Sequence, residues 1–237
     1  MKKRSFSTST AIKILFSLFA VFLVSACIKN DNFIIGDAKV RIFNTIVSDT
    51  TRNFFFNNAL FNSQSGVSAL ATATNSSYFV VQADKEYLID SRNSITGTTS
   101  VSAKSTFALG KNYSIYYTKK NDLPATKPEF LIFPDLVRQD TTKAQVMFIN
   151  LGYTLGSKVM IKNKDNTYAT TLAYGEKSDY VSISNLKPVS TLFFNLADST
   201  GVVDSINYTN FIKGKVYTII LEGAKNGKLK QRLVANN

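Results

Sequence analysis

The sequence predicts an all-β protein, with two similar β-sandwich domains in tandem behind a cleaved N-terminal signal helix. Three observations lead to this prediction. A basic N-terminus precedes a short apolar run, short segments of alternating apolar and polar residues fill the rest of the chain, and the order of these segments repeats after about 100 residues. No long amphipathic helical pattern follows the apolar run.

The N-terminus has the layout of an export signal. The first thirteen residues contain four basic residues and no acid: Lys2, Lys3, Arg4 and Lys13. The apolar run covers residues 14–24, and uncharged sequence ends at Ile28. A membrane-spanning helix needs about 20 apolar residues, so a permanent transmembrane anchor is not expected.

A lipid attachment site follows the apolar run. Val24, Ser25 and Ala26 lead to Cys27, the only cysteine in the chain. This resembles the bacterial lipobox, in which small residues precede a cysteine that receives diacylglycerol before cleavage. The alternative is an ordinary secretory cleavage site with a chance cysteine. The sequence thus predicts a signal peptide over residues 1–26 and a mature chain held to the membrane by acyl chains, such as palmitate, on Cys27.

Residues 27–37 are interpreted as a lipidated tether to the first strand. Ile28 is not the aspartate that tends to retain lipoproteins in the inner membrane, so the outer membrane is expected. Lys29 and Asp31 faintly resemble the charged surface-export signals of some lipoproteins. Whether the protein faces the periplasm or the cell surface stays open.

An internal repeat divides the mature chain into two units. Three pairs of segments match in the same order: Ala38–Asn44 with Ala144–Asn150, Ser77–Tyr78 with Asp179–Tyr180, and Phe107–Ile115 with Phe211–Ile219. The offsets of 106, 102 and 104 residues differ by at most four. We therefore predict a tandem duplication with domains at 38–140 and 141–237, joined within the polar segment 134–143.

Each unit contains the number of short strands found in an immunoglobulin-like sandwich. In the first unit the alternation predicts strands near 38–45, 52–57, 76–83, 86–90, 98–107, 112–118 and 129–133. In the second it predicts them near 144–151, 157–163, 167–174, 178–184, 190–197, 202–209, 215–222 and 228–234. Seven or eight strands in about 100 residues are typical of this fold.

Two tyrosines are candidates for structural tyrosine corners. Tyr113 and Tyr217 each follow a glycine by three residues, which resembles the strand entry of fibronectin-type sandwiches. There the tyrosine hydroxyl bonds back to the backbone, whereas the alternative is a tyrosine that only packs in the core.

The wider order of motifs resembles a known family. An opening A-x-V-x-x-x-N strand, a Ser-Tyr or Asp-Tyr before a later strand, and G-K-x-Y-[ST]-I are similar to the domain-of-unknown-function 4397 family. That family is found in exported bacterial proteins, often as tandem lipoproteins. The first unit departs from the pattern by a longer segment between Asn57 and Ser76. The resemblance implies a fold and a location, and no activity.

Composition argues against several kinds of chemistry. The chain has no His, and its single Cys is assigned to lipid, so nucleophilic pairs with His and most zinc sites are excluded, and no cofactor or metal is predicted. The turn Asn163–Asn166 offers oxygen ligands but lacks the pattern of a calcium loop, so a β-turn is favoured.

The positive charge does not by itself indicate a partner. Removal of residues 1–26 reduces the formal net charge from +12 to +8. Anionic headgroups or acidic glycans could be attracted, but the lysines are spread along the sequence, so a solvated surface is favoured. Export argues against nucleic acid as a partner.

The acidic residues and the aromatic runs bear on catalysis and on ligand binding. A hydrolase acting on envelope glycans could use paired carboxylates, yet Glu86, Glu129, Glu176 and Glu222 form no distinctive pair in sequence. The runs Phe54–Phe56 and Leu192–Phe194 put bulky groups on both faces of their strands, and exposed aromatics could stack on sugar rings. Burial is favoured over such a ligand platform, because the sandwich core takes half of each run and the neighbouring domain could cover the other half.

The sequence therefore predicts a lipid-anchored envelope protein with a non-catalytic binding or structural role. The membrane is its first partner, through the anchor, and a polysaccharide, an envelope protein or a host surface is the expected second. The alternative is the glycan hydrolase with paired carboxylates.

Overall fold

The computed structural model describes residues 37–61, 69–136, 141–164, 167–183, 191–199 and 201–236. The predicted signal peptide, the lipobox from Val24 to Cys27 and the tether up to residue 36 lie outside the described residues. Ile35–Asn237 forms one compact unit.

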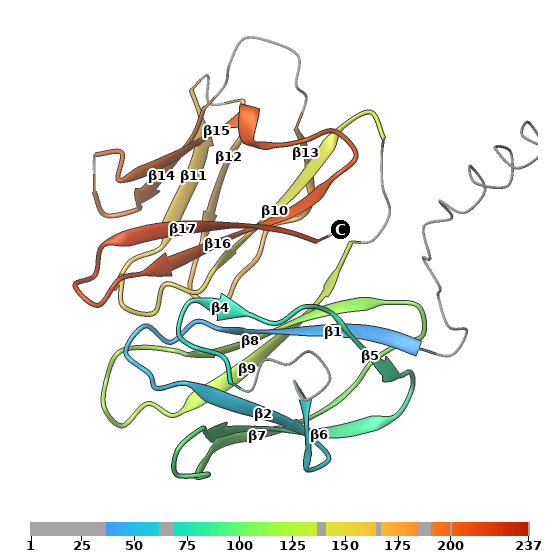
Figure 1. Ribbon diagram of the computed structural model, residues 1–237. Coiled ribbons are helices and arrows are strands. Elements are labelled where there is room, and N and C mark those ends of the chain that lie inside the picture. Colours follow the sequence, from blue (N-terminus) through green and yellow to red (C-terminus); the bar gives the residue numbers. More distant parts are fainter. Residues whose placement is uncertain are drawn as a thin grey trace, which may run out of the picture. The chain divides into compact units, whose positions relative to one another are not determined.

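Two sheets make up the first sandwich (Figure 1). Sheet A has the order β4-β1-β8-β9, with β5 also paired to β1, and sheet B has the order β3-β2-β6-β7. The strands of sheet A are β1 (Asp37–Asn44), β4 (Thr74–Asn75), β5 (Phe79–Gln82), β8 (Asn112–Lys119) and β9 (Pro128–Asp135). Those of sheet B are β2 (Arg52–Phe56), β3 (Ala59–Leu60), β6 (Glu86–Asn93) and β7 (Thr99–Thr106).

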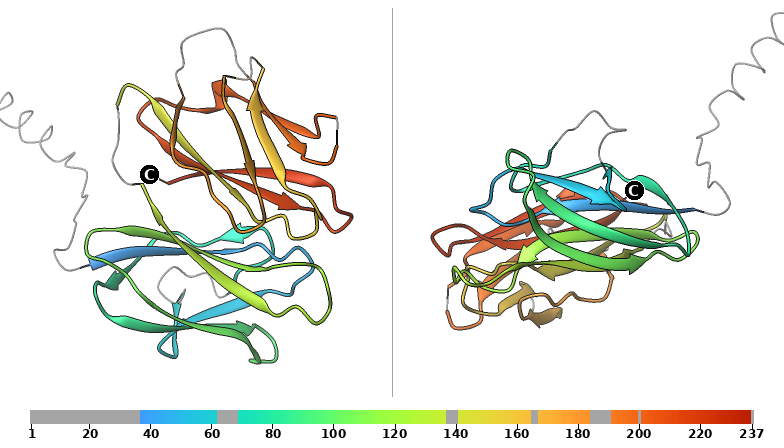
Figure 2. Two further views of the ribbon diagram at one scale, coloured as in Figure 1. Left: turned by 180° about the vertical axis from the view of Figure 1, so that it is seen from behind. Right: turned by 90° about the horizontal axis from the view of Figure 1, so that it is seen from below.

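The second sandwich repeats this arrangement, as Figures 1 and 2 show in yellow to red. Sheet C has the order β13-β10-β16-β17, and sheet D has the order β12-β11-β14-β15. The strands of sheet C are β10 (Ala144–Asn150), β13 (Val181–Ile183), β16 (Val216–Gly223) and β17 (Leu229–Ala235). Those of sheet D are β11 (Val159–Asn163), β12 (Ala169–Leu172), β14 (Thr191–Leu196) and β15 (Asp204–Asn207), followed by a 3-10 turn, η2 (Tyr208–Asn210).

Each sandwich encloses its own core because alternate residues of each strand point between its two sheets. In β1 these are Ala38, Val40 and Ile42, and all three are buried. The first core also contains Phe54, Ile89, Ile115 and Tyr117, and the second contains Val146, Phe148, Ile161, Phe194 and Ile219. The all-β fold of two tandem sandwiches is thus confirmed.

The repeat extends to the pairing register. β1 and β8 are parallel, with Val40 opposite Tyr113, and β10 and β16 are parallel, with Val146 opposite Tyr217. These are the same positions that the sequence motifs align.

A buried asparagine explains why the opening motif ends in Asn. The Asn44 side-chain amide donates to the Leu70 carbonyl at 3.1 Å, and that of Asn150 donates to the Leu172 carbonyl at 2.9 Å. Each asparagine thus bonds to a backbone carbonyl in a distant segment of its own sandwich. A buried polar group without a hydrogen bond would cost stability, so an apolar residue at either position would leave that carbonyl unpaired.

The predicted strands are all present, within a few residues of the expected bounds. The two-residue strands β3 and β4 were not predicted, because a segment this short has no periodicity to detect. Asp37, assigned to the tether, is instead the first residue of β1 and pairs with Gln82. The predicted joint also begins too early, since β9 continues to Asp135.

A third apolar cluster lies between the sandwiches. It contains Phe43, Tyr116, Ile149, Leu151 and Ile220, which point outward from sheets A and C and are nevertheless buried. Sheets A and C therefore cover each other's outer faces.

The two sandwiches are stacked with equivalent ends together. We call the end at which β1, β8, β10 and β16 begin the entry end, and the opposite end the loop end. Near the entry end, Arg41 bonds to Asn236, and at the loop end the Tyr153 hydroxyl accepts a bond from the Val47 amide at 3.2 Å. The β1–β2, β6–β7 and β8–β9 connections of the first sandwich all lie at the loop end.

Candidate functional site

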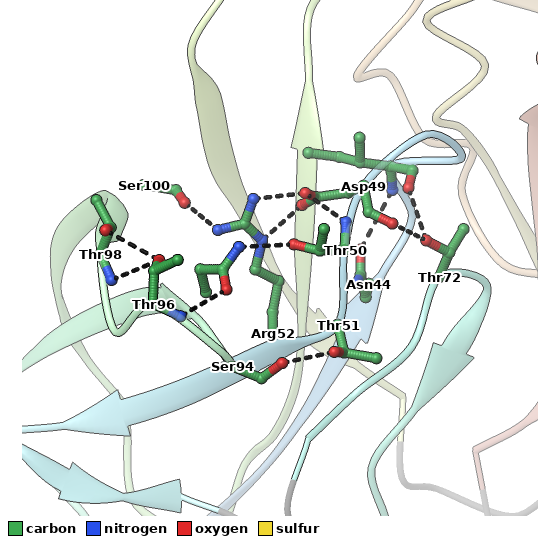
Figure 3. Close-up of polar contacts among 12 residues, drawn as sticks. Asn44, Asp49, Thr50, Thr51, Arg52, Thr72, Ser94, Thr96, Thr98 and Ser100 are labelled. Atoms are coloured by element: carbon green, nitrogen blue, oxygen red, sulfur yellow. Dashed lines mark hydrogen bonds and ion pairs between the residues drawn. The ribbon is translucent and has the colours of Figure 1, made fainter.

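A polar cluster joins the connections at the loop end of the first sandwich (Figure 3). Arg52, the first residue of β2, forms an ion pair with Asp49, with Nε 2.7 Å from Oδ2. Its guanidinium also bonds to Ser100 of β7 and lies 5.7 Å from the centre of the Tyr117 ring. The hydrogen bond to Asp49 is the main cause that raises the pKa of Arg52, and the planar guanidinium suits this paired geometry.

The aromatic ring of Tyr117 lies against the Arg52 guanidinium. The pKa of its hydroxyl is raised to about 12, mainly by burial and also by the Asp49 carboxylate, while Arg52 opposes the shift. The phenol is therefore neutral at physiological pH. It provides an aromatic face for the guanidinium and not an ionised group for catalysis.

Asn93 fixes the shape of the β6–β7 connection. Its side-chain oxygen accepts bonds from the amides of Ile95 and Thr96, at 2.8 and 3.0 Å. Its side-chain amide donates to the Thr50 hydroxyl at 3.0 Å. The β6–β7 and β1–β2 connections are therefore tied to each other, although 43 residues separate the bonded pair in sequence.

Two more hydroxyl contacts complete the cluster. Thr51 and Ser94 share a hydrogen bond of 2.6 Å. Thr72 donates to the carbonyls of Ile46 and Asp49, at 3.1 and 3.2 Å. Three segments of the chain thus hold one another at this end, which limits the freedom that a partner would have to remove on binding.

The tip of the tied connection is apolar. Ile95 is 85% exposed, and it stands among the exposed hydroxyls of Thr96 and Thr98. Leu123 of the β8–β9 connection, at the same end, is 64% exposed. Single exposed apolar residues are common, but Ile95 is held at the tip of a loop whose backbone is bonded in place.

A second feature is a pocket of about 350 Å³ where the sandwiches meet. Its lining is mostly polar: Arg41, Asn75, Ser76, Ser77, Tyr78, Val234, Ala235 and Asn236. The volume is at the lower limit of small-ligand sites. Arg41 is 3% exposed and already donates to Ser114, to the Ala235 carbonyl and to Asn236, at 2.9, 3.0 and 2.6 Å. Its cation is therefore engaged in joining the sandwiches.

The tyrosine neighbouring this cation is half-buried. The Arg41 guanidinium lies 4.6 Å from the centre of the Tyr78 ring, and the Tyr78 hydroxyl donates to the Asp135 carboxylate at 2.6 Å. Burial, with help from that carboxylate, raises the pKa of Tyr78. The group is a neutral hydrogen-bond donor in this network.

The tyrosines singled out from the sequence occupy equivalent places. The Tyr113 hydroxyl accepts a bond from the Ala108 amide at 3.1 Å, and the Tyr217 hydroxyl accepts one from the Ile212 amide at 3.1 Å. Each bond spans five residues and holds the turn that precedes the strand. Cys27, Val24, Ser25 and Ala26 lie outside the described residues.

The four glutamates that were considered for hydrolysis have separate partners. Glu86 pairs with Lys104, Glu129 accepts a bond from Tyr174, and Glu222 pairs with Arg232. The Glu176 carboxylate accepts a bond from the Ala173 amide. Each of the four carboxylates therefore has its own hydrogen-bond or ion-pair partner.

The proposed turn at Asn163 is a hairpin in its described part. The Asn163 backbone amide donates to the Tyr168 carbonyl at 3.1 Å, and its side chain bonds to both Thr167 and Tyr168. Asp165 and Asn166 lie outside the described residues.

The aromatic runs divide between core and surface. Phe54, Phe56 and Phe194 are buried, while Phe55 and Phe193 are half-buried. The expectation that the neighbouring domain covers the outward residues needs correction for Phe55. Arg92 of the same sheet covers it, with the guanidinium 4.2 Å from the ring centre.

Sequence reasoning missed both Arg41 and the Asp49–Arg52 cluster. One signal for Arg41 was available, because the aligned position of the second unit holds Met147, an apolar residue on an outward position. Arg52 and Asp49 gave no such signal, since charged residues beside a turn are normally solvated.

The described residues contain neither a metal-ligand cluster nor a helix that could span a membrane. No group of three or more Cys, Asp or Glu residues there is arranged to hold a metal ion. None of its helices is long and apolar enough to cross a membrane.

Comparison with known proteins does not identify a family for this chain. No family model matches the chain, and no curated protein is similar to it in sequence. Among solved structures, a carbohydrate-binding module of family CBM26 from Eubacterium rectale, in complex with maltoheptaose, matches 85% of this chain and 97% of its own at 12% identity. The TM-score of 0.26 is too low to support an argument about function.

Proposed function

We propose that this protein is a lipoprotein of the bacterial outer membrane that binds an envelope polysaccharide or protein, without catalysis, through the loop end of its first sandwich. Lipid on Cys27 would hold the mature chain to the membrane, as the basic N-terminus and the Val24–Cys27 motif predict. The resemblance to the domain-of-unknown-function 4397 family is part of this proposal and has the same basis in sequence.

One observation carries the binding role. The exposed side chain of Ile95 is presented by a connection that Asn93 holds through three hydrogen bonds. The fold itself does not require an apolar side chain at this tip, because the residue contributes little to the core. A rigid scaffold that presents an exposed loop is the usual arrangement of a recognition surface.

The position of the connection fits this role. The loop end lies at the opposite end of β1 from Asp37, where the chain enters the first sandwich. Because the predicted anchor precedes Asp37 by ten residues, strand β1 runs from the anchored side toward the proposed recognition surface.

Binding is tested with the mature chain carrying Cys27→Ser, so that no lipid interferes. We expect saturable binding to one polysaccharide of a glycan array or to one purified envelope protein. Ile95→Asp should weaken it at least tenfold. Val202→Asp is the matched control, because Val202 is 55% exposed in the β14–β15 connection, the counterpart in the second sandwich. Equal effects of both substitutions, or no saturable binding, would reject the loop end as the recognition surface.

The anchor needs a separate test. The full chain should yield a processed form that carries acyl chains by mass spectrometry and partitions into detergent. Cys27→Ser should abolish both. A processed parent chain that carries no acyl chain on Cys27 would contradict the proposed anchor and leave the binding result unaffected.

A further inference from the structure

One turn at the entry end of the second sandwich brings together three lysines and an isoleucine: Lys143, Lys213, Lys215 and Ile212. The Gly214 amide donates to the Lys143 carbonyl at 3.1 Å, and the Lys215 carbonyl accepts a bond from the Gln145 amide at 3.0 Å. Lys143 and Lys213 are exposed, and Ile212 is 63% exposed. Residues distant in sequence thus form one basic surface with an apolar tip.

The described segments that form this turn contain no acid. The segments 141–145 and 211–215 together contain three lysines and neither Asp nor Glu. The left-handed backbone of Gly214, with φ of +78°, lets the chain reverse here, so that Ile212 and Lys213 project from the end of the sandwich.

The first sandwich has the equivalent turn at the same end. The Gly110 amide donates to the Asp37 carbonyl at 2.9 Å, and the Lys39 amide donates to the Lys111 carbonyl at 3.0 Å. Leu109 is 52% exposed beside the exposed Lys111. Asp37 reduces the charge of this turn, so the excess of positive charge at the entry end comes from the second sandwich.

The two turns belong to one end of the compact unit. The contact of Arg41 with Asn236 joins the sandwiches near the ends where β1 and β10 begin. The chain also enters β1 here, ten residues after Cys27. A ten-residue segment spans at most about 36 Å, so an anchored chain would keep this end close to the membrane.

We propose that the entry end docks on anionic phospholipid headgroups, with the lysines near the phosphates and with Ile212 and Leu109 inserted among the headgroups. The orientation toward the membrane rests on the proposed lipid anchor, but the affinity of the surface does not. Basic residues beside exposed apolar side chains are the combination that anionic bilayers attract. The docked end would leave the loop end facing away from the bilayer.

The test uses the unlipidated mature chain with Cys27→Ser and sedimentation with vesicles. We expect it to bind vesicles of phosphatidylethanolamine and phosphatidylglycerol, to bind neutral phosphatidylcholine vesicles at least tenfold less, and to release as salt rises. Lys143→Glu with Lys213→Glu should lower binding at least tenfold, and Leu109→Ser with Ile212→Ser should lower it severalfold.

The matched control makes the same charge change elsewhere. Lys225→Glu with Lys228→Glu alters two exposed lysines of the β16–β17 turn at the loop end. This variant should keep most of the binding, and thermal unfolding should show that all variants are folded. Equal binding to neutral vesicles, no binding to anionic ones, or an equal loss in the control would overturn the proposal. Because no lipid is attached in any arm, these results are independent of the anchor at Cys27.

Discussion

The Arg41 guanidinium donates to the side-chain oxygen of Asn236 at 2.6 Å, and this bond joins the first strand of the first sandwich to the end of the last strand of the second. The two residues are 195 positions apart. Arg41 also lies 3.8 Å from Asp135, whose side chain is 1% exposed. A buried ion pair therefore stands where two copies of one fold meet.

The two copies differ at this junction. Tyr113 faces Pro134 in the first sandwich and Tyr217 faces Ala235 in the second, so Asp135 and Asn236 occupy equivalent places. Arg41 is likewise equivalent to Met147. The first copy thus has the charged residues Arg41 and Asp135 where the second copy has the neutral residues Met147 and Asn236.

We expect Arg41→Met alone to lower the free energy of unfolding by about 3 kcal/mol, because it leaves the buried Asp135 carboxylate without its cation. The double variant Arg41→Met with Asp135→Asn should recover at least half of that loss, since it gives the first copy the residues of the second. Urea unfolding of the unlipidated mature chain measures both. Additive losses in the double variant would show that the pair is not coupled.

The tyrosine corners provide a prediction with an internal comparison. Tyr113→Phe and Tyr217→Phe each remove one bond to a backbone amide, so each should cost about 1 kcal/mol. The two losses should be similar and additive because the bonds lie in different sandwiches. Chemical denaturation of the single and double variants checks this. Unchanged stability would mean that the rings act by packing alone.

The strands were predictable because their information is local. Val40 and Ile42 alternate with polar residues, and this period of two appears in sequence whether or not the neighbouring strand is known. The recurrence of Asn44 as Asn150 and of Tyr113 as Tyr217 also predicted that the two domains are copies of one fold. The fold follows from patterns that a few adjacent residues contain.

The sites were less predictable because they depend on distant segments. Arg41 alternates with core residues, which places it on the outer face of sheet A, but sheet C covers that face. Asn93 similarly gives no sign that its side chain reaches Thr50. Such contacts arise only after the sheets are assembled, and alternation along one strand cannot indicate them.

A pH-dependent contribution is expected from Glu222. Burial raises its pKa above 4.5, while Arg232, at 2.6 Å, opposes this shift. A carboxyl whose pKa is higher in the folded state stabilises the fold below the unfolded pKa and loses that contribution as pH rises through the folded pKa. The free energy of unfolding of the parent chain, relative to that of Glu222→Gln, should therefore fall as pH rises from 4.5 through the folded-state pKa of Glu222. Denaturation of both proteins at several pH values isolates this effect. A parent chain whose stability rises with pH relative to that of Glu222→Gln would contradict this prediction.

Removal of the Asn93 side chain should make the β6–β7 connection more flexible and have little effect on the stability of the fold. Asn93→Ala removes the bonds to the amides of Ile95 and Thr96 and to Thr50, but these groups are exposed to water, so the fold should lose only about 1 kcal/mol or less. The amides of Ile95 and Thr96 should exchange with deuterium much faster, and partner binding should weaken severalfold because the tip must then be ordered on binding.

The control for this substitution is Asn226→Ala, which removes a comparable exposed bond to the Lys228 amide, 3.2 Å long, in the β16–β17 turn. It should speed exchange locally and leave partner binding unchanged. If Asn93→Ala speeds exchange but does not weaken binding, the fixed shape of the β6–β7 connection is not what the partner recognises. If it weakens binding as expected, the hydrogen bonds of Figure 3 act by holding Ile95 in the position that the partner contacts.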